Sequence, residues 1–304
     1  MNRPDVLVLG GGGVLGEAWL RSALAGLEAE TGWALRDCDA FVGTSAGSIV
    51  AAVLAAGRRP EVTAGIAQGW EEAAGAATAP AGVARRLGGA VLAAAAPVAP
   101  MAAAGLAPGR AALRAAILKR GPAGTRPIPG LAAALRKLGT DFDGRLRVAA
   151  VERRSGRRVV FGAPGAPPAT VEEAVLASCS VPWVFRPVTI GGVEYVDGGA
   201  WSPANLDVAP VRRGTRVLCL NPTASPRLAR DRVGAVRAFA GATAAAEALV
   251  LRRRGADVRV VSPDAAAVAA IGPDLFDARR RAAVEAAGFA QGRAMATAGN
   301  VGRA

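Results

Sequence analysis

The first 60 residues alternate twice between a short apolar run, a glycine-rich turn and a segment with helical spacing. The run from Asp5 to Leu9 leads into four glycines, and apolar residues from Val14 to Thr31 then recur at helical intervals. A second apolar run from Asp39 to Val42 is followed by a helical segment from Ala46 to Ala56. This repetition predicts an α/β fold, in which a mainly parallel sheet carries helices on both faces.

The later sequence continues the mixed pattern, and no internal repeat or domain boundary stands out. We therefore expect one domain over residues 1–304, with its C-terminal helices in about 231–304. A hairpin is predicted from strands at 145–151 and 158–161, followed by a short helix at 170–177. Further strands are predicted at 193–196, 216–220 and 258–261, and long helices at 233–254 and 277–297.

Between about residues 61 and 126 the pattern loosens, and we expect an Ala-rich helical insertion or lid. Its segment Leu87–Gly109 has no charged residue, but Pro97, Pro100 and Pro108 interrupt it. Alanine and glycine, which dominate this segment, drive membrane insertion only weakly. The sequence leaves open whether it is a lid, core or a membrane contact, and favours no membrane-spanning helix.

The complete absence of histidine restricts the chemistry of this chain. A Ser-His-Asp triad and any histidine-ligated metal site are excluded, so a general base must come from Asp, Glu, Lys, Tyr or Cys. The three cysteines, Cys38, Cys179 and Cys219, are widely separated and form neither a disulfide framework nor a metal-binding spacing. We expect no metal and no cofactor.

The formal net charge of +13 favours anionic partners. The arginines occur as scattered pairs and triplets without interleaved aromatic residues, which argues against nucleic-acid binding. Peripheral association with an anionic membrane is expected instead. Because the first strand begins directly after Met-Asn-Arg-Pro, a signal peptide is not expected, and a cytoplasmic location is predicted.

The segment Gly43-Thr-Ser45-Ala-Gly47 is the first candidate for chemistry. It lies between a predicted strand and a predicted helix, which is the context of a nucleophile elbow. Flanking glycines permit a sharp turn that exposes the serine hydroxyl, and the helix N-terminus favours negative charge nearby. We predict Ser45 to be a nucleophile.

The glycine-rich turn after the first strand is the second candidate. Successive glycines direct backbone N–H groups into one concavity, which can bind a phosphate or the oxygen of a tetrahedral intermediate. The segment that could form this concavity runs from Gly10 to Gly16.

The same turn, through Gly11, Gly13 and Gly16, also fits the dinucleotide-binding fingerprint, so a nucleotide-binding oxidoreductase is a competing interpretation. That fingerprint requires an acidic residue at the end of the second strand. Here the second strand runs into the Ser45 motif, which favours the oxyanion hole.

The third candidate is Asp197-Gly198-Gly199, which follows a predicted strand. In isolation such a segment is a turn. In a chain without histidine, however, a serine nucleophile requires another base, and a partly desolvated carboxylate can accept the hydroxyl proton directly. Asp197 is better placed for this role than its neighbours Glu194 and Asp207.

These segments, in this order, resemble the patatin-like phospholipase family. A fourth stretch, from Ala177 through Ser178 and Pro182 to Pro187, is similar to the Ala-Ser-x-x-x-Pro-x-x-Phe-x-Pro segment of bacterial members. The resemblance covers roughly residues 5–222 without the Ala-rich insertion.

The resemblance implies a three-layer α/β/α sandwich and hydrolysis of acyl groups from phospholipids or other lipids by a Ser-Asp dyad, here Ser45 and Asp197. It also implies that backbone N–H groups of Gly11, Gly12, Gly13 and Val14 form the oxyanion hole. One departure is Leu15, where the family usually has Arg or Lys. A non-catalytic lipid-surface module that kept the same fold is the remaining alternative.

Overall fold

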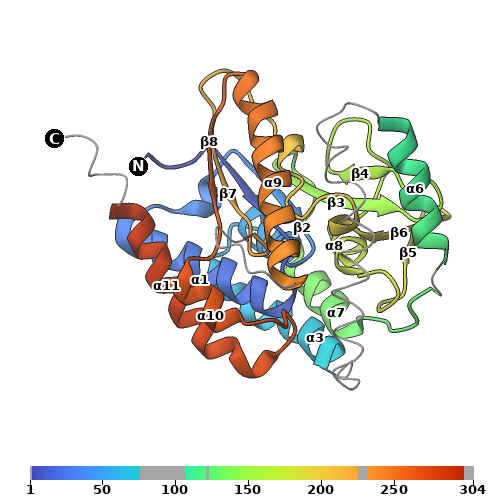
Figure 1. Cartoon of the computed structure of the whole chain (residues 1–304), viewed down its shortest axis with the longest axis horizontal. Helices are drawn as coiled ribbons and strands as arrows, with labels where there is room; N and C mark the ends of the chain where they lie inside the picture. Colours follow the sequence, from blue (N-terminus) through green and yellow to red (C-terminus); the bar gives the residue numbers. More distant parts are fainter. Residues whose placement is uncertain (1, 76–106, 121–122, 225–231, 298–304) are drawn as a thin grey trace.

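The computed structural model describes residues 2–75, 107–120, 123–224 and 232–297 (Figure 1). Eight strands within these residues form one sheet: β1 (Val6–Leu9), β2 (Ala40–Thr44), β3 (Leu146–Glu152), β4 (Arg158–Phe161), β5 (Val188–Ile190), β6 (Val193–Asp197), β7 (Arg216–Leu220) and β8 (Asp257–Val261). The helices are α1 (Gly13–Thr31), α2 (Ala46–Ala55), α3 (Thr63–Gly75), α6 (Ala107–Arg120), α7 (Pro129–Leu138), α8 (Val171–Cys179), α9 (Arg232–Arg253), α10 (Ala265–Ile271) and α11 (Arg281–Thr297).

The strand order in the sheet is β5-β6-β3-β2-β1-β7-β8, with β4 paired to β3. The neighbours β3-β2-β1-β7-β8 are all parallel, whereas β4, β6 and β5 add antiparallel pairings at the β3 end. Strands β1 and β2 are adjacent, so their carboxyl ends lie side by side. The glycine-rich turn and the Ser45 motif therefore emerge at the same edge of the sheet.

Alternate residues of the central strands pack into two separate cores. In β1, Leu7 and Leu9 join the larger core with α1, α2, α8 and α11, whereas Val6 and Val8 join a second core with α9 and residues 204–209. Because successive side chains of a strand point to opposite faces, these two cores lie on opposite sides of the sheet. The fold is thus a mixed α/β sandwich of three layers.

Helix α1 begins in the glycine-rich turn and is held firmly against α11 (Figure 1). The Trp19 indole N–H donates to the Gln291 side chain at 2.9 Å. The buried carboxylate of Glu17 forms ion pairs with Arg21 at 3.2 Å and with Arg281 at 2.5 Å. These contacts anchor the helix whose first residues form one wall of the candidate site.

The predicted strands, the hairpin of β3 and β4, and the helices α1, α2, α8 and α9 are confirmed with end shifts of one or two residues. Helix α11 begins at Arg281, after a short 3-10 turn, and not at Asp277 as predicted. The sequence did not predict α7, β5 or α10. Residues 76–106 of the Ala-rich insertion lie outside the described residues, and no helix in the described ranges is apolar and long enough to cross a bilayer.

Candidate active site

Strands β2 and β6 meet end to end along one edge of β3. The pairing of β2 with β3 ends at Thr44 opposite Ala149, and the antiparallel pairing of β6 ends at Asp197 opposite Ala150. A strand has only two hydrogen-bonding edges, and β4 pairs with residues 148–151 of β3 along one of them. Strands β2 and β6 therefore share the remaining edge of β3, one after the other. The ends of β2 and β6 therefore face each other, and this brings Ser45 close to Asp197.

Ser45 has a backbone conformation that residues other than glycine rarely adopt. Its φ of 51° and ψ of −123° place it at a sharp corner between β2 and α2, as the elbow motif predicts. Such a conformation persists only where the surrounding structure holds it, and it is typical of functional sites. Ser45 is also the N-cap residue of α2, where the helix dipole favours negative charge.

Close packing requires a glycine at position 47, two residues after Ser45. A Cβ at Gly47 would lie 2.0 Å from the carbonyl oxygen of Leu9, at the end of β1. Any larger residue would force α2 away from β1 and thereby move the Ser45 corner. Gly43 is similarly confined, since a Cβ there would lie 2.4 Å from the Ser48 Cα, whereas a Cβ at Gly16 would lie 3.1 Å from the Pro222 Cβ.

Asp197 is buried, with 5% of its surface exposed. One of its carboxylate oxygens accepts the backbone N–H of Gly199 at 2.7 Å, and the Ser45 side chain also interacts with the carboxylate and lowers its pKa. Burial raises the pKa of Asp197 from 3.8 to about 7, against the opposing effect of these two interactions. A carboxyl with this pKa can both accept and return a proton near neutral pH.

The other acidic residues near Asp197 in the sequence are held by arginines. Glu194 pairs with Arg153 at 2.9 Å, and Asp207 pairs through both oxygens with Arg158 at 2.6 and 2.7 Å. Of these three carboxyl groups, only that of Asp197 interacts with the Ser45 side chain.

The glycine-rich turn lies beside Ser45, since a Cβ at Gly11 would be 3.2 Å from the Ser45 Cβ. The Gly11 N–H itself donates to the carbonyl of Pro203 at 2.8 Å, so this amide is engaged within the protein. Among the described residues, none accepts a hydrogen bond from the backbone N–H of Gly12, Gly13 or Val14. These three amides, at the N-terminus of α1, can accept an anion as ligand.

The segment before α11 fixes the shape of this turn. The Leu275 carbonyl accepts the Leu15 N–H at 2.9 Å, and the same oxygen would lie 2.8 Å from a Cβ at Gly13, whose φ is +63°. The Leu15 side chain is fully buried in the larger core. Packing against Leu275 thus orders the turn at the position where the resembled family usually has a cation.

Sequence reasoning did not identify Asn205, which connects the two halves of the site. Its side-chain amide donates to Thr44 Oγ1 at 3.1 Å and to the carbonyl of Gly198 at 3.3 Å, and is also 2.7 Å from the Ser202 carbonyl. Thr44 is the residue before Ser45, and Gly198 is the residue after Asp197. Its left-handed φ of 49° suits asparagine, but the printed sequence carries no stronger signal for this role.

A further carboxyl, that of the partly buried Glu247 of α9, lies next to the loop that contains Asn205. It accepts the Leu206 N–H at 2.9 Å, and burial raises its pKa to about 8 against the opposing effect of the Ser202 side chain. Glu247 therefore belongs to the layer that supports the loop after Asp197.

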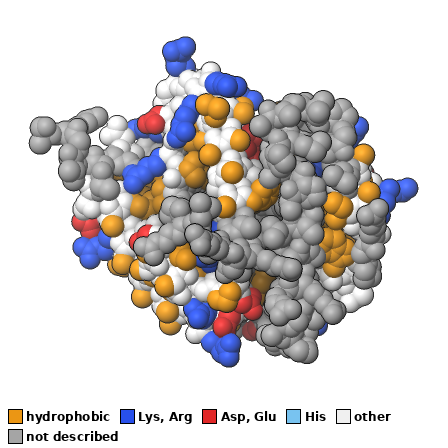
Figure 2. Space-filling view, in the orientation of Figure 1, with side chains coloured by type: hydrophobic (Ala, Val, Ile, Leu, Met, Phe, Trp, Pro, Cys, Tyr) orange, Lys and Arg blue, Asp and Glu red, His pale blue; other side chains and the backbone are white. Residues whose placement is uncertain are grey.

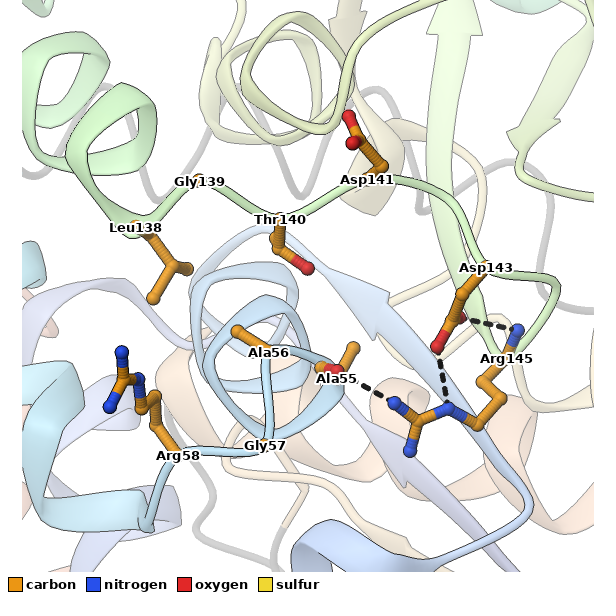
Figure 3. A pocket seen from close by; sticks show the side chains of 10 residues that line it. All are labelled: Ala55, Ala56, Gly57, Arg58, Leu138, Gly139, Thr140, Asp141, Asp143 and Arg145. Carbon is orange, nitrogen blue, oxygen red and sulfur yellow. Dashed lines mark hydrogen bonds and ion pairs between the residues drawn. The ribbon is translucent and has the colours of Figure 1, made fainter.

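A cavity of about 430 Å³ lies away from these residues (Figure 3). It is lined by Ala55–Arg58 at the C-terminal end of α2, by residues 138–141, and by Asp143 and Arg145, which pair at 2.7 Å. Ser45 is at the other end of α2, which is roughly 15 Å long. This cavity is separate from the candidate site. Among the described residues, no group of three acidic, cysteine or histidine side chains could hold a metal ion.

Comparison with known proteins identifies one family. The model of the family described as patatin-like phospholipase matches residues 7–210, which is 204 of the 304 residues. Of the solved structures, VipD from Legionella pneumophila is similar at a TM-score of 0.47 and 15% sequence identity, over 98% of this chain and 67% of that one. No curated protein matches.

Proposed function

Because the chain belongs to the patatin-like phospholipase family, a family of lipid acyl hydrolases, we propose that it cleaves phospholipids, lysophospholipids or other lipid esters through a covalent acyl–serine intermediate. The observation that carries this proposal is the interaction of the Ser45 side chain with the buried Asp197 carboxylate, in a chain without histidine. Family membership favours this interpretation over the dinucleotide-binding one.

In the proposed acylation step, Asp197 accepts the proton of the Ser45 hydroxyl as Oγ forms a bond to the ester carbonyl carbon. The carbonyl oxygen becomes an anion and accepts hydrogen bonds from the backbone N–H groups of Gly12, Gly13 and Val14. The carbon–oxygen bond to the alcohol then breaks, and Asp197 returns its proton to the departing alcohol.

Deacylation repeats these steps with water. Asp197 accepts a proton from the water molecule that attacks the acyl carbon, and the same three amides receive the negative oxygen. The fatty acid leaves as the proton returns to Ser45 Oγ. No external cofactor is required by this sequence of bond changes.

The direct test is covalent labelling of the wild-type chain. A fluorophosphonate phosphonylates only an activated serine, so intact-mass measurement should show one adduct, and peptide mapping should place it on Ser45. Hydrolysis of phospholipid and lysophospholipid vesicles would define the substrate class. A non-catalytic lipid-surface module would give no adduct and release no fatty acid.

The pH dependence of turnover should follow the ionisation of Asp197. Only the carboxylate form can accept the serine proton, and burial raises its pKa to about 7. We therefore expect kcat/KM for a neutral ester to rise with pH, with a midpoint near 7, and to level off above it. Glu247→Gln removes another carboxyl whose pKa is raised, to about 8, and should leave this rise with pH unchanged. A flat profile between about pH 5 and 8 would contradict the role of Asp197.

Association with anionic membranes is also proposed, on the basis of the net charge of +13 and the lipid substrate class. Figure 2 shows Lys and Arg side chains projecting from several parts of the visible face. Binding to vesicles that contain anionic phospholipid should weaken strongly between about 0.05 and 0.5 M salt, because salt screens such attraction. Equal binding to purely phosphatidylcholine vesicles would refute an electrostatic contribution. A cytoplasmic location stays a prediction.

A further inference from the structure

The strained main chain of Ser45 is held by a small set of hydrogen bonds. Its carbonyl oxygen accepts the Ser48 N–H at 2.8 Å, the Ser48 hydroxyl at 2.6 Å and the Cys179 thiol at 3.4 Å. Its N–H donates to the Ser178 hydroxyl oxygen at 2.8 Å. Two of the residues that hold this corner, Ser178 and Cys179, come from the last turn of α8, far away in the sequence.

The Ser178 hydroxyl connects two parts of the site. It accepts the Ser45 N–H and donates its own proton to the carbonyl of Ala149 at 2.7 Å. Ala149 is the β3 residue paired with Thr44, and it precedes Ala150, which is paired with Asp197. A hydroxyl can accept and donate at once, which an alanine at this position could not do. The nucleophile corner is thereby tied to the strand on which both halves of the site align.

The same turn of α8 also contacts the base. The carbonyl of Ser180 accepts the backbone N–H of Asp197 at 2.9 Å. Helix α8 is fixed at its other end by a capping box between Thr170 and Glu173. Residues 178–180 therefore bond to the main chains of Ser45 and Asp197 together.

We propose that Ser178 is a positioning residue, whose hydroxyl holds the main chain of Ser45 in the orientation that directs its side chain toward Asp197. This inference rests on the proposed function of Ser45 as nucleophile. It assigns a role to the first serine of the Ala177–Pro187 segment, which the hydrolytic steps themselves do not use. Ser178 is fully buried, so its role is to act through Ser45.

Replacement of Ser178 should slow the chemical step and leave substrate binding almost unchanged. In Ser178→Ala, kcat for a p-nitrophenyl ester and the rate constant of fluorophosphonate labelling should each fall about 10- to 100-fold, with KM within about twofold of wild type. A purely structural loss would lower the amount of folded protein but not the kcat of the protein that remains folded. Active-site titration and near-UV circular dichroism measure the folded fraction.

Thr215→Ala is the matched control. The hydroxyl of the buried Thr215 also accepts a backbone N–H, that of Arg212 at 3.0 Å, but Thr215 precedes β7 and so lies at the opposite end of the parallel strands from Ser45. This variant should label at the wild-type rate. Ser178→Cys keeps the side-chain shape with a weakly hydrogen-bonding thiol, and it should label more slowly than wild type even if Ser178→Ala does not fold.

The outcomes separate the two proposals. Absence of labelling at Ser45 in the wild-type chain would overturn the proposed function and the role of Ser178 with it. Labelling of wild type at Ser45, together with a wild-type rate in folded Ser178→Ala or Ser178→Cys, would overturn only the role of Ser178. Equal losses in Ser178→Ala and Thr215→Ala would likewise overturn it.

Discussion

Ser45→Ala is expected to abolish ester turnover almost completely, with kcat/KM reduced on the order of 10⁴-fold or more. The substitution removes the atom that would form the acyl intermediate, and the amides of the glycine-rich turn cannot replace it as a nucleophile. The measurement is the initial rate with a short-chain p-nitrophenyl ester, together with the mass of the protein after fluorophosphonate treatment. No adduct should form.

Ser155→Ala, in the turn between β3 and β4, provides the control for Ser45→Ala, because Ser155 takes no part in the site. It should keep wild-type turnover and labelling. Turnover that persists in Ser45→Ala above about 10% of the wild-type rate would show that another group is the nucleophile.

Asp197→Asn is expected to lower kcat by about 10³- to 10⁴-fold with a much smaller change in KM. The amide cannot accept the serine proton, although its oxygen can still accept the Gly199 N–H that Asp197 binds at 2.7 Å. The free energy of unfolding should therefore fall by no more than about 1 kcal/mol. Steady-state kinetics and thermal denaturation measure the two effects separately.

Glu194→Gln is the matched carboxylate control for Asp197→Asn. Glu194 lies in the same strand and pairs with Arg153, away from Ser45, so its replacement should leave kcat within about twofold of wild type.

The double variant Ser45→Ala with Asp197→Asn tests whether the two side chains act together. If they act as a unit, this double variant should be no slower than Ser45→Ala alone. If the activation free energies lost in the two single variants add in full in the double variant, the two side chains act in separate steps.

The structure adds supporting residues that the motifs do not contain. Asn205 connects Thr44 with the Gly198 carbonyl, Leu275 orders the glycine-rich turn, and Ser178 holds the Ser45 N–H. None of them lies next in sequence to the residue it supports. Their contribution follows from the close packing around a strained corner, which needs partners from several directions.

Most of the fold was predictable because its signals are local. The apolar runs of β1 and β2 and the spacing in α1 and α9 each show within one segment of the chain. The unpredicted elements are short or obscured. Strand β5 has three residues, α10 has seven, and α7 begins at a proline followed by glycine, a pair more typical of turns than of helices.

By itself the sequence determined the two glycine turns, the candidate nucleophile and the absence of any histidine base, because these depend on residue identity and on a few neighbouring dihedral angles. Only the tertiary structure decided that β6 shares one edge of β3 with β2, so that Asp197 reaches Ser45 and not solvent or an arginine. That register joins distant segments and is set by burial of the sheet on both faces, which no local pattern contains. The raised pKa of Asp197 has the same origin, since desolvation arises only when the surrounding layers are assembled.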